Sequence, residues 1–111
     1  MPTKKLTKDP VKKGRPVKTR TISRQPKTKQ FSPRGRVGRP GYKEIKLEEF
    51  EAIRLTDYMG LNQSEASKSM GVSQQTFSRV LRSGRKHLSE ALVNGEIIRV
   101  QGGVFKVENN T

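Results

Sequence analysis

The sequence predicts a mainly α fold, in which a three-helix helix-turn-helix domain follows a disordered basic N-terminal arm and precedes a C-terminal β-hairpin. Three observations support this prediction. Apolar residues are sparse up to residue 39, they recur at helical spacing over 47–92, and they alternate around a Gly-Gly pair after residue 96. The predicted boundaries are 1–43 for the arm, 44–95 for the helix-turn-helix domain, and 96–111 for the hairpin and tail.

The arm holds all of the excess positive charge. Formal net charge is +14; residues 1–43 contain 15 Lys and Arg against Asp9 alone, whereas residues 44–111 contain nine Lys and Arg and nine Asp and Glu. With so few apolar side chains, the arm cannot offset the entropy cost of ordering. Its cations favour a polyanionic partner, because neutralised phosphates release condensed counterions. A binding protein is therefore favoured over a metabolic enzyme.

The chain contains no cysteine and no apolar run long enough for a membrane helix. Disulfides and thiolate metal sites are therefore excluded, as in many intracellular proteins. Residues 1–29 also lack the apolar centre of a signal peptide. These features predict a soluble cytoplasmic protein without membrane contact, located on the nucleoid if it binds DNA.

The first predicted helix covers residues 47–59 and ends at Gly60. Its apolar residues recur every three or four positions, whereas Lys46 offers no oxygen to cap the free amides. Three glutamates lie between the apolar positions: Glu48, Glu49 and Glu51. We expect them on a solvated face that complements the helix dipole; the alternative is a surface that binds a basic partner, including the arm of the same chain.

The second and third predicted helices are defined by their caps. Asn62, with a glutamate three residues later, predicts the start of a two-turn helix that ends at Gly71. Ser73 predicts the start of a long helix that the Asn-Gly pair at 94–95 ends. Gly84 lies on the apolar stripe of this helix, where a missing side chain permits close packing.

The C-terminal segment predicts a hairpin around Gly102 and Gly103, a pair that tolerates the positive φ of a tight turn. Its register would oppose Val100 to Phe105, Ile98 to Val107 and Arg99 to Lys106. The two apolar pairs would share one face, and the like-charged pair would lie on the other. Because a two-stranded hairpin is marginal alone, we expect its apolar face to dock on the helices or, alternatively, to form a dimer edge.

The spacing around Gly71 predicts a helix-turn-helix. Five apolar residues at offsets 0, 4, 6, 11 and 14 would form the small core shared by two crossed helices: Ala66, Met70, Val72, Phe77 and Val80. Gly71 would take the tight or positive-φ position, and Ser73 would cap the second helix. The alternative is a solvated helix in an ordinary helical hairpin.

The second helix of this motif would present polar and basic residues to DNA. Gln pairs with adenine and Arg with guanine through two hydrogen bonds each, and Arg also holds phosphates. The free amides at the start of the helix suit a phosphate as well. The predicted contact residues on this helix are Ser73, Gln74, Gln75, Thr76, Ser78, Arg79, Arg82, Arg85 and Lys86.

Residues 15–103 resemble a small prokaryotic family of uncharacterised, predicted DNA-binding proteins with a helix-turn-helix like that of sigma-factor region 4. The segments FEAIRL, MGVSQQTFSRVL and EALVNG are the most specific part of the resemblance. It implies a winged-helix-related, region-4-like helical fold and a role in transcription. Thr19 and Ser23 stand where members often carry cysteine, which puts any thiol function in doubt. Lys46 replaces a capping threonine and Ser67 a small apolar residue, which predicts somewhat lower stability.

Gly-Arg-Pro occurs twice beside basic residues, as KKGRPVK at 12–18 and RVGRPG at 36–41. Such motifs resemble AT-hooks, in which an arginine enters the minor groove of A/T-rich DNA. Arg15 of the first copy is a candidate minor-groove residue. In the second copy Val37 interrupts the basic flank, so Arg39 is the weaker candidate and marks the junction between arm and domain. Linker chemistry is the alternative for both.

No catalytic or metal site can be assembled from the sequence. His87 is the only histidine, and we expect it to be an exposed helical residue beside two cations. Ser83 and Ser89 lack the buried Asp and the pocket that a catalytic triad needs. We therefore expect no enzymatic activity and no cofactor.

These features predict a double-stranded DNA-binding protein that acts as a transcription regulator or nucleoid-associated factor. One alternative is an RNA-binding or ribosome-associated protein, because basic arms also enter folded RNA. Another is a module that docks on RNA polymerase through the first helix and the hairpin. A homodimer is compatible with the main prediction, because a single helix-turn-helix contacts few bases.

Overall fold

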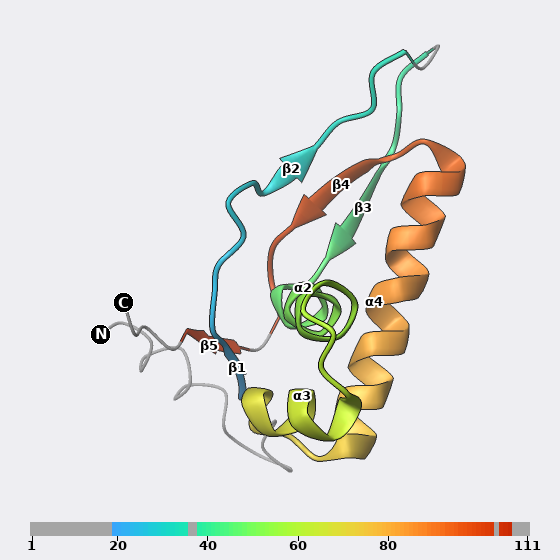
Figure 1. The fold of residues 1–111 in the computed structure, drawn as a ribbon. Coiled ribbons are helices and arrows are strands. Elements are labelled where there is room, and N and C mark those ends of the chain that lie inside the picture. The colour runs from blue at the N-terminus through green and yellow to red at the C-terminus, as the bar shows by residue number, and fades with distance from the viewer. Residues whose placement is uncertain (1–18, 36–37, 104, 108–111) are drawn as a thin grey trace, which may run out of the picture.

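The computed structural model describes residues 19–35, 38–103 and 105–107 (Figure 1). Strands and helices follow in this order: β1 (Arg20–Ile22), β2 (Gln30–Phe31), β3 (Tyr42–Ile45), α2 (Leu47–Ile53), the π-helical segment η1 (Arg54–Tyr58), α3 (Gln63–Met70), α4 (Gln74–Asn94), β4 (Ile97–Val100) and β5 (Phe105–Val107). The predicted mainly α fold with three helices is confirmed, because η1 continues α2 directly and the two together form the first predicted helix.

The predicted caps of α3 and α4 are present. Asn62 Oδ1 accepts a hydrogen bond from the Glu65 amide at 2.8 Å, and the Glu65 carboxylate accepts one from the Asn62 amide at 3.1 Å. Ser73 Oγ accepts from the Thr76 amide at 3.0 Å. Gly71 ends α3 in the left-handed conformation at φ 69°, which a side chain would disfavour. Local sequence signals therefore fix both ends of the turn.

The helices share one apolar core. Its buried members are Ala52, Leu55, Ala66, Met70, Val72, Phe77, Val80 and Leu81. Close packing at Gly84 is confirmed: a Cβ added there would lie 2.9 Å from Glu49 Cβ. The missing side chain lets α4 approach α2 more closely than any other residue would allow.

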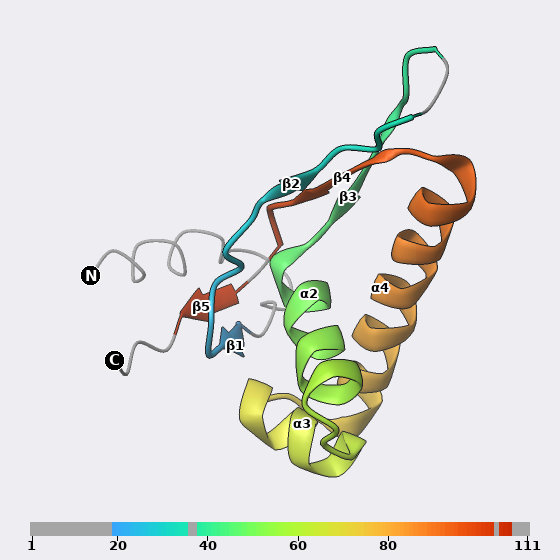
Figure 2. The ribbon, with the colours of Figure 1, turned by 45° about the horizontal axis from the view of Figure 1, so that its top comes forward.

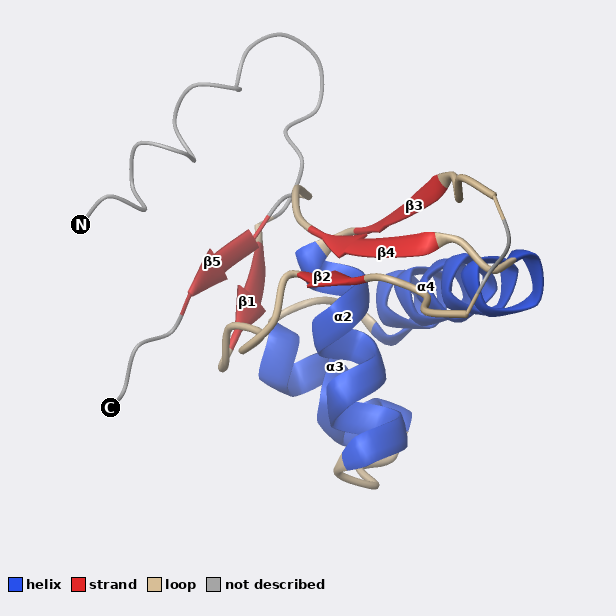
Figure 3. Cartoon of the chain, turned by 90° about the horizontal axis from the view of Figure 1, so that it is seen from above, coloured by secondary structure: helices blue, strands red, loops and turns tan. Residues whose placement is uncertain are grey.

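Strand β4 is the centre of a three-stranded sheet ordered β2-β4-β3, in which it runs antiparallel to β2 and parallel to β3. Seen from above, β3 and β4 lie along α4 (Figure 3). A second core cluster fills the space below the sheet, with Ile22, Ile45, Leu47 and Val100 buried.

The predicted C-terminal hairpin is wrong in its pairing. Val100 pairs with Ile45, and Phe105 pairs with Arg20, so β5 forms a separate parallel pair with β1. Because β4 already has a partner on each side, it has no free edge for β5. The Gly102–Gly103 link instead carries the chain past α2, where the Gly102 carbonyl accepts from the Leu47 amide at 3.0 Å.

The predicted extent of the arm is also corrected. Residues 20–43 supply β1, β2 and the start of β3, and Ile22 is fully buried in the second core cluster. Composition alone did not predict that this segment is folded, because the partner strands of β1 and β2 lie at the other end of the chain. The remaining segment of the predicted arm, residues 1–18, lies outside the described residues.

The three glutamates of the first helix are buried rather than solvated. Glu51 is 0% exposed; it accepts from the Ser23 amide at 3.1 Å and pairs with Arg54 at 2.9 Å. Glu48 lies 4.0 Å from the Arg20 guanidinium. The alternative reading of this face, a surface for the basic segment of the same chain, is therefore the one that the structure supports.

None of the helices within the described ranges is both long enough and apolar enough to cross a membrane.

Candidate nucleic-acid interface

The turn between α3 and α4 holds the start of α4 in a fixed direction. The Gly71 amide donates to the Lys68 carbonyl at 3.1 Å, and the Val72 amide donates to the Ser67 carbonyl at 3.1 Å. Val72 is buried between the two helices. The polar substitution Ser67 is accommodated, because its hydroxyl donates to the Ser64 carbonyl at 3.0 Å. The two predicted helices, the left-handed Gly71 between them and the Ser73 cap are thus present at the end of the molecule where α4 begins (Figure 1).

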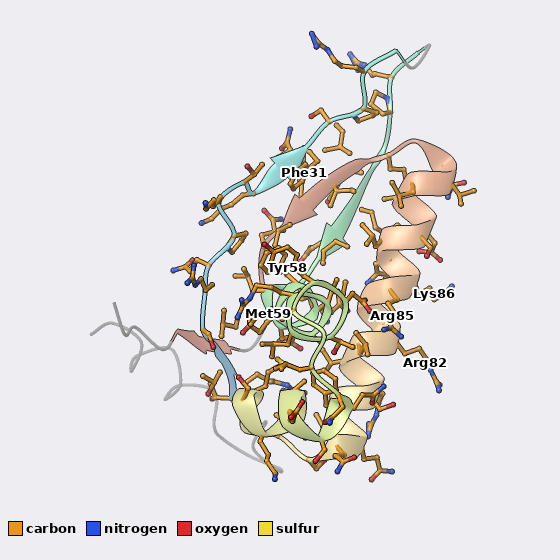
Figure 4. The ribbon with its side chains drawn as sticks, in the orientation of Figure 1. Phe31, Tyr58, Met59, Arg82, Arg85 and Lys86 are labelled. Atoms are coloured by element: carbon orange, nitrogen blue, oxygen red, sulfur yellow. The ribbon has the colours of Figure 1, made fainter. Side chains whose placement is uncertain are left out.

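The first turns of α4 present side chains that the rest of the domain does not use. Gln74, Gln75, Arg79 and Arg82 are exposed, and Ser78 is half-buried. Within the described part of the chain, no hydrogen bond or ion pair engages the side chains of these two glutamines and two arginines. Arg82 extends away from the body of the molecule (Figure 4). Their donors and acceptors are available to a partner.

The predicted contact residues further along α4 are engaged by neighbours. Arg85 holds Asp57 of η1 with contacts of 2.6 and 3.1 Å, and the hydrogen bond from Arg85 lowers the pKa of the Asp57 carboxyl. Lys86 donates to Glu90 at 2.8 Å. Exposed ion pairs of this kind contribute little to stability because solvent screens them, so a phosphate could replace either carboxylate.

Glu90 joins α4 to the sheet as well. Its carboxylate lies 3.1 Å from Lys43 Nζ of β3. Hydrogen bonds from Lys86 and Lys43 lower the pKa of Glu90 to about 2. The carboxylate therefore stays ionised under mildly acidic conditions.

A pocket of about 230 Å³ opens beside the first turns of α4, between β1 and the start of α2. Its lining residues are Arg20, Lys46, Glu48, Glu49, Thr76, Arg79, Val80 and Ser83. Thr76 and Arg79 thus belong both to the predicted contact surface and to this pocket. The cations Arg20 and Lys46 were not among the predicted site residues. No local signal marks Arg20, because its position depends on the long-range pairing of β1 with β5.

Glu49 forms a polar cluster in the wall of the pocket. Its carboxylate accepts from the Lys46 amide at 3.0 Å and from Ser83 Oγ at 2.6 Å, and it lies 3.2 Å from His87 Nδ1. His87, expected to be exposed, is half-buried against α2 because it faces this carboxylate. The carboxylate stands between serine and histidine, whereas a catalytic triad places the histidine next to the nucleophile. Among the described residues, no group of His, Asp and Glu could hold a metal ion.

Of the two Gly-Arg-Pro arginines, Arg39 alone belongs to the described part of the chain. Arg15 lies outside the described residues. Arg39 is exposed and belongs to the link between β2 and β3. This link projects at the opposite end of the molecule from the start of α4 (Figure 2). Arg39 does not mark the junction of arm and domain, because β1 and β2 precede it. The described part of the chain begins at Thr19, next to Arg20, which lines the pocket.

Comparison with known proteins identifies relatives over most of the chain. The family model described as "Protein of unknown function DUF134" matches residues 10–108. A UPF0251 protein of Methanococcus maripaludis strain C7 is 40% identical over 97 residues, which cover 86% of this chain and 75% of the relative. Relatives from Caldicellulosiruptor bescii (43% identical; 86% of this chain, 66% of the relative) and Dehalococcoides mccartyi strain BAV1 (40% identical; 85% and 81%) carry the same UPF0251 name. No solved structure matches the chain significantly.

Proposed function

The chain belongs to the family of proteins of unknown function DUF134, and we propose that it is a double-stranded DNA-binding protein that acts as a transcription regulator or nucleoid-associated factor. Membership confirms the resemblance to an uncharacterised prokaryotic family. The names of the relatives state no activity, so the proposal rests on the chemistry of the surface. It requires neither a catalytic step nor a cofactor, and it would locate the protein on the nucleoid.

The observation that carries the proposal is the set of uncommitted side chains at the start of α4. A capped, packed helix fixes the backbone positions of Gln75, Arg79 and Arg82, so little backbone entropy would be lost when they bind. The spacing of these residues, four and then three positions, aligns them along one face of the helix. Gln and Arg are the side chains that recognise adenine and guanine edges in the major groove.

The attachment point of residues 1–18 supports the same surface. This segment contains seven Lys and Arg against Asp9 alone, and it joins the domain at Thr19. The next residue, Arg20, lines the same pocket as Arg79. A basic segment that starts here could follow the phosphates or the minor groove of a duplex held by α4, with Arg15 as the minor-groove residue. Binding of bases and binding of the backbone would then occur at one end of the molecule.

Selection of bound fragments from random duplex DNA tests the proposal. The full chain should enrich a short motif, and a variant that lacks residues 2–18 should enrich the same motif with lower affinity and a flatter dependence on salt. Binding without any enriched motif would contradict sequence preference. Preference for structured RNA over the enriched duplex at one salt concentration would instead support the RNA-binding alternative.

A second candidate, docking on RNA polymerase, is favoured by exposed apolar side chains near the end of the first helix. Tyr58 is 83% exposed and Met59 lies beside it, while Phe31 is exposed on β2 (Figure 4). Large exposed apolar side chains that lie together often mark protein interfaces. Capture of RNA polymerase that survives nuclease treatment and is lost on Tyr58→Ser and Met59→Ser would support this candidate.

A further inference from the structure

A second basic surface lies along the free edge of the three-stranded sheet. Residues 23–43 contain no Asp or Glu. Five exposed cations, here called the basic edge, come from this segment: Arg24, Lys27, Lys29, Arg34 and Arg39. Among the described residues, none of these five forms an ion pair. Unbalanced charge of this density favours a polyanion as partner.

The domain holds the backbone of the basic edge in place. The Lys29 carbonyl accepts from the Val100 amide at 2.9 Å, and β2 pairs with β4 at the next two positions. Pro26 is buried, and so is Ile22 just before the edge begins. The domain therefore holds the backbone around Lys27 and Lys29, and Arg34 and Arg39 follow in the link to β3. The side of β2 that faces away from β4 has no strand partner in the described sheet.

The basic edge leads away from the start of α4. In Figures 1 and 2 the segment runs from β1 past β2 to a link that projects beyond the C-terminal end of α4. The 21 residues of α4 make it about 31 Å long. The major groove curves around the duplex. A straight helix that inserts its first turns into this groove therefore leaves the DNA surface toward its far end. Arg34 and Arg39 would then lie off that duplex.

We propose that the basic edge binds the phosphates of a second DNA duplex, so that one protein molecule bridges two segments of DNA. This inference rests on the proposed function, because α4 must hold the first duplex. The basic edge lies on an extended segment and its links rather than on a helix that could enter a groove, so its Lys and Arg side chains would contact the phosphate backbone, which carries no sequence information. The contact at the basic edge is therefore independent of sequence and sensitive to salt, whereas the contact at α4 depends on sequence.

A two-duplex capture experiment tests the bridge. A duplex with the enriched motif is fixed to beads, the full chain is added, and retention of a second, fluorescent duplex of unrelated sequence is measured. The test variant combines Lys27→Gln, Lys29→Gln, Arg34→Gln and Arg39→Gln, all at exposed positions. The matched control removes the same number of cations from the N-terminal segment with Lys4→Gln, Lys5→Gln, Lys8→Gln and Lys12→Gln. Circular dichroism checks that both variants are folded.

The expected result separates the two contacts. The basic-edge variant should retain roughly tenfold less of the second duplex, while its affinity for one duplex in solution changes by less than about threefold. The control should bind one duplex more weakly, yet a saturated bead should still capture the second. Undiminished capture of the second duplex by the basic-edge variant overturns the proposal. A dimer whose subunits join at another surface would give this result. A parallel loss of single-duplex affinity, or preferential capture of a hairpin RNA, also overturns the proposal. Failure of the unmodified chain to bind even one duplex would contradict the proposed function instead.

Discussion

Residues 63–95 and residues 19–45 differ in what determines their structure. The first segment consists of two helices whose ends are set by residues within three or four positions of each other, such as Ser73 and Thr76. The second forms three short strands whose partners, β4 and β5, follow the helices in sequence. Local chemistry therefore specifies the candidate DNA-contacting helix, whereas long-range pairing specifies the segment that surrounds it.

The largest stability effect should come from Glu51 of α2, whose carboxylate accepts a hydrogen bond from the Ser23 amide of the second segment. Glu51→Ala would leave the Arg54 guanidinium and the Ser23 amide without their acceptor in a buried site. Loss of one partner from a buried ion pair typically costs 3–5 kcal/mol, so we expect a loss of about 3 kcal/mol in the free energy of unfolding. Urea denaturation measures it. Glu44→Ala, at an exposed position, is the control; a cost as small as that of the control would mean that Glu51 is solvated after all.

Ile22→Ala should be nearly as costly. Ile22 is fully buried within a segment whose composition predicts disorder, and truncation of a buried Ile costs about 2–5 kcal/mol. Val93→Ala, at a position 83% exposed on α4, should change the free energy of unfolding by less than about 0.5 kcal/mol. If the two substitutions had equal effects in urea denaturation, residues 19–43 would belong to a free arm.

Ser73→Ala should have a smaller effect, confined to the helix-turn-helix. The substitution removes the acceptor for the Thr76 amide, and loss of such a cap costs about 1 kcal/mol. Hydrogen exchange should report faster opening at the first turn of α4. Unchanged protection of these amides would show that packing at Val72, rather than the cap, fixes the start of the helix.

The smallest effect should be a pH dependence at Glu90, which joins β3 to α4 through Lys43. The folded-state pKa of about 2 lies below the ordinary value of 4.5, so the stabilisation is present above about pH 4.5 and disappears as pH falls through about 2. Glu90→Gln should therefore lower stability at pH 6 and approach the stability of the unmodified chain at pH 2. Urea denaturation measures the free energy of unfolding of both proteins. A difference between them that stays constant from pH 6 to pH 2 would exclude this effect of Glu90 ionisation on stability.

Much of the helical part of the fold could be predicted because its determinants are local. The Asn62 and Ser73 caps and the left-handed Gly71 are readable from a few neighbouring residues. The glutamates show the limit of that approach. Helical spacing places Glu51 outside the apolar stripe, but β1 packs against α2 and the residue that follows β1, Ser23, donates its amide to Glu51. Only the folded chain reveals that a polar face is buried.

The residues of the candidate site also differ in whether the sequence alone could identify them. Gln75, Arg79 and Arg82 follow from the position of the helix cap, so sequence alone could name them. Arg20 and Lys46 could not be named, because they reach the pocket only through β1 and the start of α2. For the same reason, deletion of residues 1–43 would remove Ile22, the strands β1 and β2 and the start of β3. Deletion of residues 2–18 removes the basic segment and leaves these strands in place.

The most direct test of DNA recognition by α4 is the affinity of Arg79→Ala for the enriched duplex and for random duplex DNA at one salt concentration. If Arg79 contacts a base, the enriched duplex should lose about 1–3 kcal/mol of binding free energy, roughly tenfold to hundredfold in Kd, and random DNA clearly less. An equal loss on both duplexes would show that Arg79 holds only a phosphate. No loss on either would contradict the account of α4 as the DNA-contacting helix.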